Sequence, residues 1–549
     1  MRDRLIQLVD LLPAAAAVAL LVNLVLLWAA RIPYPYDLEW MEGGMLAHSW
    51  RLQQGLAIYV TPGPDFIPYV YPPGYASLVA ILGSVFGLTY PLARMVALSG
   101  TFVAASALVY GVVKQTGSLR MGAVSAVVFL GTYPASGAFY DLIRPDALYL
   151  AFLAWAIVLA VEQRKGAVMA AGLLLAAGFL MKHNAAAFGL PIAVALWYRD
   201  GWRKAAQFAL FAAVPAGLMT VYLQWGSGGH FLVYLLEVPT SHPRIWSRVL
   251  PGMFRDVGTA LPILSGTLGL WAILYHGKRL ESLPEYLSMT VPIATGVFLA
   301  WYGFTLGHPA PGTYHFGASF AFWGLGAGAT SAVLYLMIGQ RPSWQWVYGL
   351  ALLVTGLVMA ALMRAHNGGF LNVYMHVYWL MALAFGLVLA QWRQVLRKEW
   401  VIVATALLAA SQIGWQLGRL DRAKLSPTEA DRIAGDAFVE AIRDIDGPVL
   451  SPFAAWIPVY AGKEPSLHLI ALWDLNYKHG PYYAEVESIK TAVAEHHWAA
   501  VIDGSKPLGY GLQKAYIVAE TPDVPKGALA PKMGWPARPA RIVVPKPDK

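Results

Sequence analysis

Three carboxylates lie close together near the start of the sequence, in surroundings that favour acid–base chemistry. Asp37, Glu39 and Glu42 fall directly after an apolar stretch and have aromatic neighbours. Carboxylates clustered in an apolar setting have their pKa values pushed apart, which is how a general base is produced. The same pattern is typical of a solvated loop that caps a helix, so both interpretations stay open. If a divalent cation binds, Asp37 and Glu39 are its candidate ligands, although such a pair is a weak signal.

Side chains that can hold an anion recur in segments that we expect on the same side of a membrane as Asp37. The basic ones are Arg31, Arg51, Arg94, Arg144, Lys182, Arg244, Arg248, Arg255 and Arg364. The histidines are His48, His183, His230, His242, His308, His315, His366 and His376. Snorkelling of long side chains explains some of them, but the whole set predicts a polar cavity that opens to that side.

The overall composition excludes an ordinary soluble enzyme. Of 549 residues, 58% are hydrophobic and 13% are charged, whereas about 25% is typical of soluble domains. Apolar runs of about 20 residues recur up to residue 418, and each can cross a lipid bilayer. The excess of basic residues is better explained by helix ends at a membrane than by nucleic acid, which we do not expect as a partner. The sequence has no Cys and no phosphate-binding, dinucleotide or metalloprotease motif.

The pattern predicts a mainly α-helical, polytopic membrane protein with about 13 transmembrane helices. The predicted spans are 11–30, 92–113, 121–139, 147–161, 166–181, 184–198, 205–224, 258–275, 286–306, 318–338, 345–363, 372–391 and 400–418. An odd number places the two termini on opposite sides. Lys and Arg concentrate in the short turns of one side, which predicts a cytoplasmic N-terminus and an inner (cytoplasmic) membrane location.

The longer connections should lie outside the cell membrane. Residues 31–91 form one external loop, in which 76–90 is predicted to be a helix lying in the membrane interface. Residues 225–257 form the second external loop. Loops of this size are more often functional than mere connectors.

The composition changes at residue 419, which divides the chain into a transmembrane domain, 1–418, and an external domain, 419–549. Strand-like runs occur at 448–451, 498–502 and 515–518, and a helical pattern covers 427–445. These features predict a small α/β domain. The last 25 residues or so are rich in Pro and Lys and are interpreted as a tail. We expect this domain to act as a lid that shapes acceptor access.

Several short motifs follow one another in a characteristic order. The acidic cluster is followed by Pro68-Tyr-Val-Tyr-Pro-Pro-Gly-Tyr75, Tyr140-Asp-Leu-Ile-Arg-Pro-Asp146, Met181-Lys-His-Asn184 and Glu237-Val-Pro-Thr-Ser-His-Pro-Arg244. This order resembles the GT-C superfamily of integral-membrane glycosyltransferases. The similarity is to the branch that contains lipid A aminoarabinose transferases and protein O-mannosyltransferases, in glycosyltransferase family 39.

The resemblance implies a polyprenyl-phosphate sugar as donor and transfer on the external side. It places the catalytic acidic residue on Asp37, with Glu39 or Glu42 as its companion. The residues expected to bind the donor phosphate or substrate are Tyr71, Arg144, Asp146, Lys182, His183, His242 and Arg244. Aminoarabinose transferases have an acidic-basic pair where this chain has Val70 and Tyr71, so that particular substrate is not expected.

Together these features predict an inverting glycosyltransferase. Asp37 would take the proton from a hydroxyl of a glycolipid, glycan or protein acceptor, and Lys182, Arg144 and Arg244 would stabilise the leaving phosphate. No cofactor is certain, and a divalent cation stays possible. Two alternatives remain: a multi-span transporter or flippase of a lipid-linked sugar, although no internal repeat is visible, and a non-catalytic scaffold, in which the acidic cluster would have no role.

Overall fold

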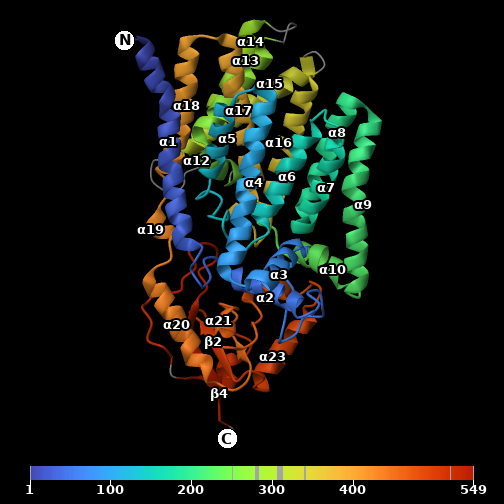
Figure 1. Ribbon diagram of the computed structural model, residues 1–549, viewed down its shortest axis with the longest axis vertical. Coiled ribbons are helices and arrows are strands. Elements are labelled where there is room, and N and C mark those ends of the chain that lie inside the picture. Colours follow the sequence, from blue (N-terminus) through green and yellow to red (C-terminus); the bar gives the residue numbers. More distant parts are fainter. Residues whose placement is uncertain are drawn as a thin grey trace.

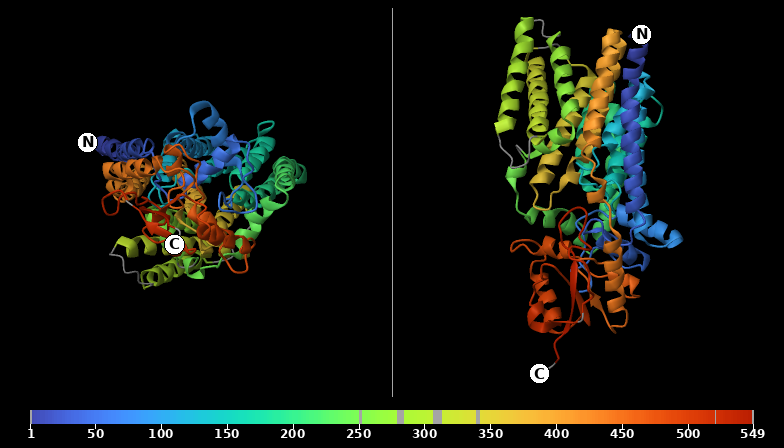
Figure 2. Two further views of the ribbon diagram at one scale, coloured as in Figure 1. Left: turned by 90° about the horizontal axis from the view of Figure 1, so that it is seen from below. Right: turned by 90° about the vertical axis from the view of Figure 1, so that its left-hand side faces the viewer.

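The computed structural model describes residues 2–249, 252–278, 284–305, 313–338, 342–519 and 521–547. Long helices run alongside one another in an elongated bundle, and a smaller domain covers one end of it (Figure 1). The N-terminus lies at the far end of the bundle, and the C-terminus leaves from the tip of the smaller domain (Figures 1 and 2). The two termini therefore lie at opposite ends of the molecule.

The bundle consists of helices of different lengths, from 9 residues in α12 to 30 in α1. The main ones are α1 (Arg2–Arg31), α2 (Glu42–Gln53), α3 (Gly74–Phe86), α4 (Tyr90–Thr116), α5 (Leu119–Leu130), α6 (Asp146–Ala160), α7 (Ala167–Met181), α8 (Gly189–Asp200), α9 (Trp202–Gly226), α12 (Gly252–Ala260), α13 (Pro262–Gly277), α14 (Glu285–Thr305), α15 (Thr313–Ile338), α16 (Trp344–Ala365), α17 (Met375–Leu396) and α18 (Glu399–Leu417). Shorter helical pieces are η1 (His183–Phe188), α10 (His230–Leu232), the π-helical η2 (Val233–Glu237), α11 (Val238–Ser241), η3 (Trp246–Arg248) and η4 (Leu371–Tyr374).

Six helices within the described residues are long and apolar enough to cross a membrane, or seven if one bent pair counts as a single span. Other predicted spans fall on shorter apolar helices such as α5, α6 and α7, so length and composition do not by themselves give thirteen. The apolar stretch of α9 is only 6% buried, whereas that of η4 and α17 is 83% buried. A helix whose apolar residues are almost all left uncovered by protein, like α9, is expected to face lipid. Helix α17, whose apolar residues are mostly buried, lies in the centre of the bundle.

Helix α5 ends nine residues earlier than the predicted span 121–139. Residues beyond Leu130 form turns, in which Gly137 adopts a φ of +73° that favours glycine. The carbonyl groups freed at the helix end are satisfied by side chains: Gln416 donates to Val128 O at 2.8 Å and Thr132 to Phe129 O at 2.7 Å. This compact turn region carries the chain to the start of α6.

Helix α3 shows that the predicted interfacial segment 76–90 is helical over most of its length. It ends at Phe86, and a new helix, α4, starts at Tyr90. The α4 start is capped by Thr89, whose side chain accepts from Leu92 N, and its end by Gly117 at φ +70°. These caps fix the boundaries of α4 because they satisfy the terminal backbone groups.

The smaller domain has a four-stranded sheet with helices packed around it. Its elements are α19 (Arg422–Leu425), α20 (Glu429–Arg443), β1 (Val449–Leu450), α21 (Ile457–Tyr460), α22 (Leu469–Leu475), η5 (Ala484–Val486), α23 (Glu487–Ala494), β2 (Ala500–Gly504), α24 (Leu512–Ala515), β3 (Tyr516–Val518) and β4 (Pro539–Pro545). The strand order is β1-β2-β4-β3, with β1 and β2 parallel and the other pairs antiparallel.

The predicted strands and the helix at 427–445 are present, but the tail differs from expectation. Strand β4, inside the segment interpreted as a tail, lies between β2 and β3 in the sheet. Ile542 and Val543 of β4 are buried. The sequence analysis missed this short strand because prolines flank it. Proline in a sequence suggests a loop, but it is tolerated at the ends of a strand.

The small domain packs directly onto the loop that follows α1. Tyr36 donates its hydroxyl to Asp436 at 2.7 Å, and Lys532 N donates to Leu38 O at 2.8 Å. Glu39 forms a parallel bridge with Met533. The domain therefore lies against the acidic loop, on the end of the bundle opposite the N-terminus (Figure 2).

Candidate active site

Glu42 is fully buried, and both of its oxygens are occupied. Arg94 of α4 donates Nε to Oε1 at 3.0 Å and Nη2 to Oε2 at 2.7 Å. Backbone N–H groups of Leu38 and Ile143 donate at 2.7 and 3.0 Å. The remaining donors of Arg94 go to the carbonyl oxygens of Arg31, Tyr34 and Tyr36. Glu42 and Arg94 therefore hold the first loop in shape, and Glu42 is poorly placed to accept a proton from a substrate.

Asp37 is held through one oxygen only. Oδ1 accepts from the Tyr90 hydroxyl and from Gly43 N, both at 2.7 Å. Oδ2 is shielded from solvent and has no hydrogen-bond partner among the described residues. Burial, together with the charge of Glu42, raises the pKa of Asp37 well above its usual value. A basic carboxylate with one oxygen fixed and the other free is the arrangement that a general base requires.

Glu39 faces a different set of groups. Its Oε2 accepts from Arg144 Nη1 at 3.2 Å and from Met41 N at 3.2 Å. Burial raises the pKa of Glu39 to about 7, and the charge of Arg144 limits that rise. Arg144 also donates Nη2 to the Tyr71 hydroxyl at 2.6 Å, and its guanidinium lies 5.3 Å from the centre of that ring. Arg144 and Tyr71, both predicted site residues, are thus in direct contact.

A second buried ion pair lies two residues beyond Arg144. Asp146 Oδ1 accepts from Lys182 Nζ at 2.6 Å and from Asn372 Nδ2 at 2.9 Å. Its Oδ2 is buried without a partner in the part of the chain that the structure describes, and the same holds for Nδ1 of His183 and Nε of Arg144. Buried polar atoms are almost always paired, so unpaired ones indicate a place where a ligand or water binds.

Tyr69 links the two halves of the site. The charges of Arg144, Glu39 and Asp37 all act on its hydroxyl, which donates to Met41 O at 3.3 Å. Asp37 and Glu39 of the first loop and Arg144, which precedes α6, therefore lie around Tyr69, although they come from segments far apart in the chain.

His242 and Arg244 lie beside the site, in the segment between α11 and η3. His242 Nδ1 lies 2.7 Å from His366 Nε2, and His242 Nε2 lies 2.8 Å from Asp474 O. Arg244 is exposed, and its backbone pairs with that of His366. The contacts of Lys182 are with Asp146, whereas those of Arg244 are with His366. That the two residues act together on a phosphate stays a prediction.

Asp474 is a site residue that sequence analysis missed. It belongs to α22 of the small domain, and its carboxylate lies 3.9 Å from His242 Nε2. Burial raises its pKa to about 7, opposed by the charge of Arg144. Its charge acts in turn on Tyr71. The sequence carried no signal for this role, because Asp474 is more than 200 residues along the chain from Arg144, Lys182 and Arg244.

The carboxylates do not gather around a common point. Over the described residues, no group of three or more His, Asp or Glu side chains is arranged to hold a metal ion. Asp37 and Glu39, the candidate ligands, engage Tyr90 and Arg144 instead.

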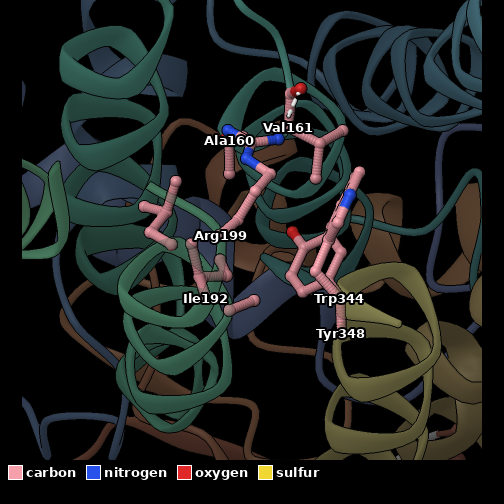
Figure 3. A pocket seen from close by; sticks show the side chains of 8 residues that line it. Ala160, Val161, Ile192, Arg199, Trp344 and Tyr348 are labelled. Carbon is pink, nitrogen blue, oxygen red and sulfur yellow. Dashed lines mark hydrogen bonds between the residues drawn. The ribbon is translucent and has the colours of Figure 1, made fainter. Parts of the chain in front are cut away.

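A small hollow at the other end of α6 and α8 is unrelated to this site (Figure 3). It lies about 20 Å along α6 from Asp146, since each helical residue adds about 1.5 Å. Arg199 fills part of it: Nη1 donates to Val161 O at 2.8 Å, and the guanidinium lies 4.8 Å from the centre of the Trp344 ring. Arg199 thus caps the last turn of α6, which is a structural role.

Residues 70–225 match the family model described as dolichyl-phosphate-mannose-protein mannosyltransferase. The matched segment contains Tyr71, Arg144, Asp146, Lys182 and His183, while the acidic loop lies before it and Arg244 after it. The resemblance to GT-C membrane glycosyltransferases that the motifs indicated is thereby confirmed. Comparison with curated proteins gives no match.

Solved structures with a similar fold come from two kinds of transferase. ArnT from Cupriavidus metallidurans in the apo state has 13% identity over 88% of this chain and 92% of that chain, with a TM-score of 0.44. The same protein bound to undecaprenyl phosphate has 14% identity over 97% of each chain and a TM-score of 0.47. Arabinosyltransferase EmbB from Mycobacterium smegmatis has 17% identity over 75% of this chain and 40% of that chain, with a TM-score of 0.34. At these identities and scores, the likenesses say nothing about the substrate.

Proposed function

We propose that this protein is a membrane glycosyltransferase that moves a sugar from a polyprenyl-phosphate donor to an acceptor hydroxyl, with inversion at the anomeric carbon. The observation that carries the proposal is a set of buried charged groups: Asp37 keeps one oxygen without a partner among the described residues, Arg144 pairs with Glu39 two residues on, and Lys182 pairs with Asp146. The match to a family named for a lipid-phosphate sugar donor covers both cations and supports the class of donor.

Asp37 is the proposed general base. Its free Oδ2 would accept the proton of the acceptor hydroxyl as that oxygen attacks the anomeric carbon. The hydrogen bonds from Tyr90 and Gly43 keep the carboxylate oriented. General-base catalysis of this kind contributes roughly 10²- to 10⁴-fold to a rate. Glu39 is the proposed companion, which orients Arg144 rather than taking the proton.

The leaving group is a lipid phosphate. As the new bond between the acceptor oxygen and the anomeric carbon forms, the bond from that carbon to the phosphate oxygen breaks and its electron pair stays on the phosphate. Arg144 and Lys182 would stabilise this developing charge in a site shielded from water. Two buried nitrogens without a partner among the described residues are further donors for the phosphate oxygens or the sugar. They are Nε of Arg144 itself and Nδ1 of His183, the residue after Lys182. Arg244 and His242 would act at the entrance.

The remaining features follow from where such a reaction must occur. We propose thirteen spans in a cytoplasmic membrane, an N-terminus in the cytoplasm, and a domain beginning near residue 419 on the external side. The prenyl chain would lie between apolar helices, while the sugar and phosphate reach the loops beneath the small domain.

The test is a transfer assay on the purified full-length chain with polyprenyl-phosphate sugars. Wild-type protein should release polyprenyl phosphate, and Asp37→Asn should abolish the release. Asp65→Asn is a matched control, because Asp65 is an exposed carboxylate of the same external loop, with 79% of its side chain accessible. No release with any such donor in the wild type, or equal release in Asp37→Asn, would contradict the proposal.

A further inference from the structure

Two tryptophans of the small domain form an exposed aromatic pair. Trp473 lies on α22, and Trp535 lies in the segment before β4. Their ring centres are 6.0 Å apart, with the planes at 81°. Trp473 is 36% exposed and Trp535 is 44% exposed. Large aromatic rings that are left open to solvent need an explanation when they stand together, because isolated exposed residues are common and clusters are not.

The aromatic pair is continuous with the proposed reaction centre. The Trp473 ring lies 5.6 Å from that of Trp40, the residue directly after Glu39. Gly534, the residue before Trp535, packs closely against the same loop. A Cβ atom at this position would lie 3.0 Å from Glu39 Oε1 and 2.9 Å from the Trp40 side chain. A molecule lying on the pair would thus have its nearer end beside Glu39.

Polar groups lie close to both rings. Lys506 places its Nζ over one face of the Trp535 ring, 4.9 Å from its centre. At the inner end, Asp474 follows Trp473 directly, and its carboxylate lies 3.9 Å from His242 Nε2. A sugar ring has an apolar C–H face and a rim of hydroxyls, and it therefore needs an aromatic face with donors and acceptors at the edge.

The rest of helix α22 offers little to an acyl chain or an apolar peptide. The leucines of α22, Leu469, Leu472 and Leu475, are buried in the core of the domain. The exposed apolar surface of this helix is consequently aromatic, without the aliphatic groove that a lipid tail or a hydrophobic side chain would fill.

We propose that Trp473 and Trp535 form an acceptor platform that binds a saccharide ring of the acceptor. This inference rests on the proposed function and narrows it: the acceptor is a glycan or the sugar portion of a glycolipid, not an unglycosylated protein. The platform holds the acceptor, and Asp474 binds its hydroxyls at the inner end, so that one hydroxyl reaches the first loop.

The platform is tested by saccharide binding without any donor. Saturation-transfer NMR on the detergent-solubilised full chain would use soluble tetrasaccharides of glucose, N-acetylglucosamine and mannose as probes. At least one probe should bind the wild type, and Trp473→Ala and Trp535→Ala should each weaken that binding about tenfold, as expected for the loss of one stacked ring. Trp473→Phe should retain part of the affinity.

Trp246→Ala provides the control, because Trp246 is a 63% exposed tryptophan of the second external loop and its ring is not part of the aromatic pair. Unchanged binding in this control and loss in the two platform variants support the proposal. No binding of any probe to the wild type, or equal binding in all variants, overturns it; a weaker association of the platform variants with lipid vesicles would then assign the rings to the membrane interface. Binding of undecaprenyl phosphate, measured on the same samples, reports separately on the donor site, so a failure there points to the proposed function instead.

Discussion

The hydroxyl of Tyr90 donates to Oδ1 of Asp37 across 2.7 Å and thereby joins the start of α4 to the loop after α1. This bond stabilises the charged form of the carboxylate and lowers its pKa, in opposition to burial, which raises it. The bond also leaves Oδ2 as the oxygen free to meet a substrate. A residue outside the acidic cluster thus lowers the pKa of Asp37, against the larger effects of burial and Glu42.

Tyr90→Phe should raise the pKa of Asp37 further. Because the base must be ionised to act, the acidic limb of the pH profile of kcat/KM should move to higher pH in this variant. Tyr75→Phe is the control, since Tyr75 is a similarly buried tyrosine whose hydroxyl donates to Ala93 O instead. An unshifted acidic limb in Tyr90→Phe would show that Asp37 does not control that limb.

Glu42→Gln should affect folding more than chemistry. The change leaves the buried Arg94 without its charge partner, and breaking a buried ion pair in this way costs about 3–5 kcal/mol. We expect a lower yield of folded protein and a lower unfolding temperature in detergent, with Asp37→Asn close to wild type in both. A normally stable Glu42→Gln without turnover would instead favour Glu42 as the base.

Much of the fold was predictable from the sequence, because the dominant signals were local. Apolar runs located many of the helices, and short strand-like runs located β1, β2 and β3. Strand β4 was missed because its flanking prolines mimic a tail. The early end of α5 was missed because Gly137 and its neighbours are apolar enough to extend the span.

The sequence indicated candidate residues for the site, but it did not indicate how they pair. Residue types and order pointed to Asp37, Arg144 and Lys182. The sequence around Glu42 did not indicate that Arg94 donates hydrogen bonds to both of its oxygens, because that pair forms only when α4 packs against the first loop. Asp474 was unpredictable for the same reason: it enters the site only through the docking of the small domain.

Stability should fall as the pH rises through the range in which Asp474 ionises. Its pKa is raised from 3.8 to about 7 in the folded protein, so its contribution is fully present below about pH 4 and is lost as the pH rises toward 7. The effect is at most about 4 kcal/mol for this shift. Asp474→Asn should therefore unfold with a weaker pH dependence between pH 5 and 7.5, as measured by thermal unfolding in detergent. An identical pH dependence in the two proteins would show that the carboxylate is not buried in the folded state.

Lys182→Gln and Arg244→Ala should separate the inner and outer cations. Lys182 is buried beside Asp146, and its loss should lower kcat by roughly 10²-fold or more, as for other groups that stabilise developing charge. Arg244 is exposed, so Arg244→Ala should mainly raise the KM for the donor, with partial recovery in Arg244→Lys, which lacks the bidentate fork. The measurement is steady-state transfer over a range of donor concentrations. Equal losses of kcat would place both residues at the phosphate, and full activity of Arg244→Ala would remove it from the site.

The most direct test measures transfer and donor binding on one preparation of Asp37→Asn. Asn keeps the shape of Asp, and its side-chain oxygen can still accept from Tyr90 and Gly43, but it cannot take the acceptor proton. We predict near-normal binding of the polyprenyl-phosphate donor and a loss of turnover of roughly 10²-fold or more, with a smaller loss in Glu39→Gln. Near-normal transfer in Asp37→Asn alongside an inactive Glu39→Gln would move the base to Glu39, and normal transfer in both would contradict the proposed mechanism.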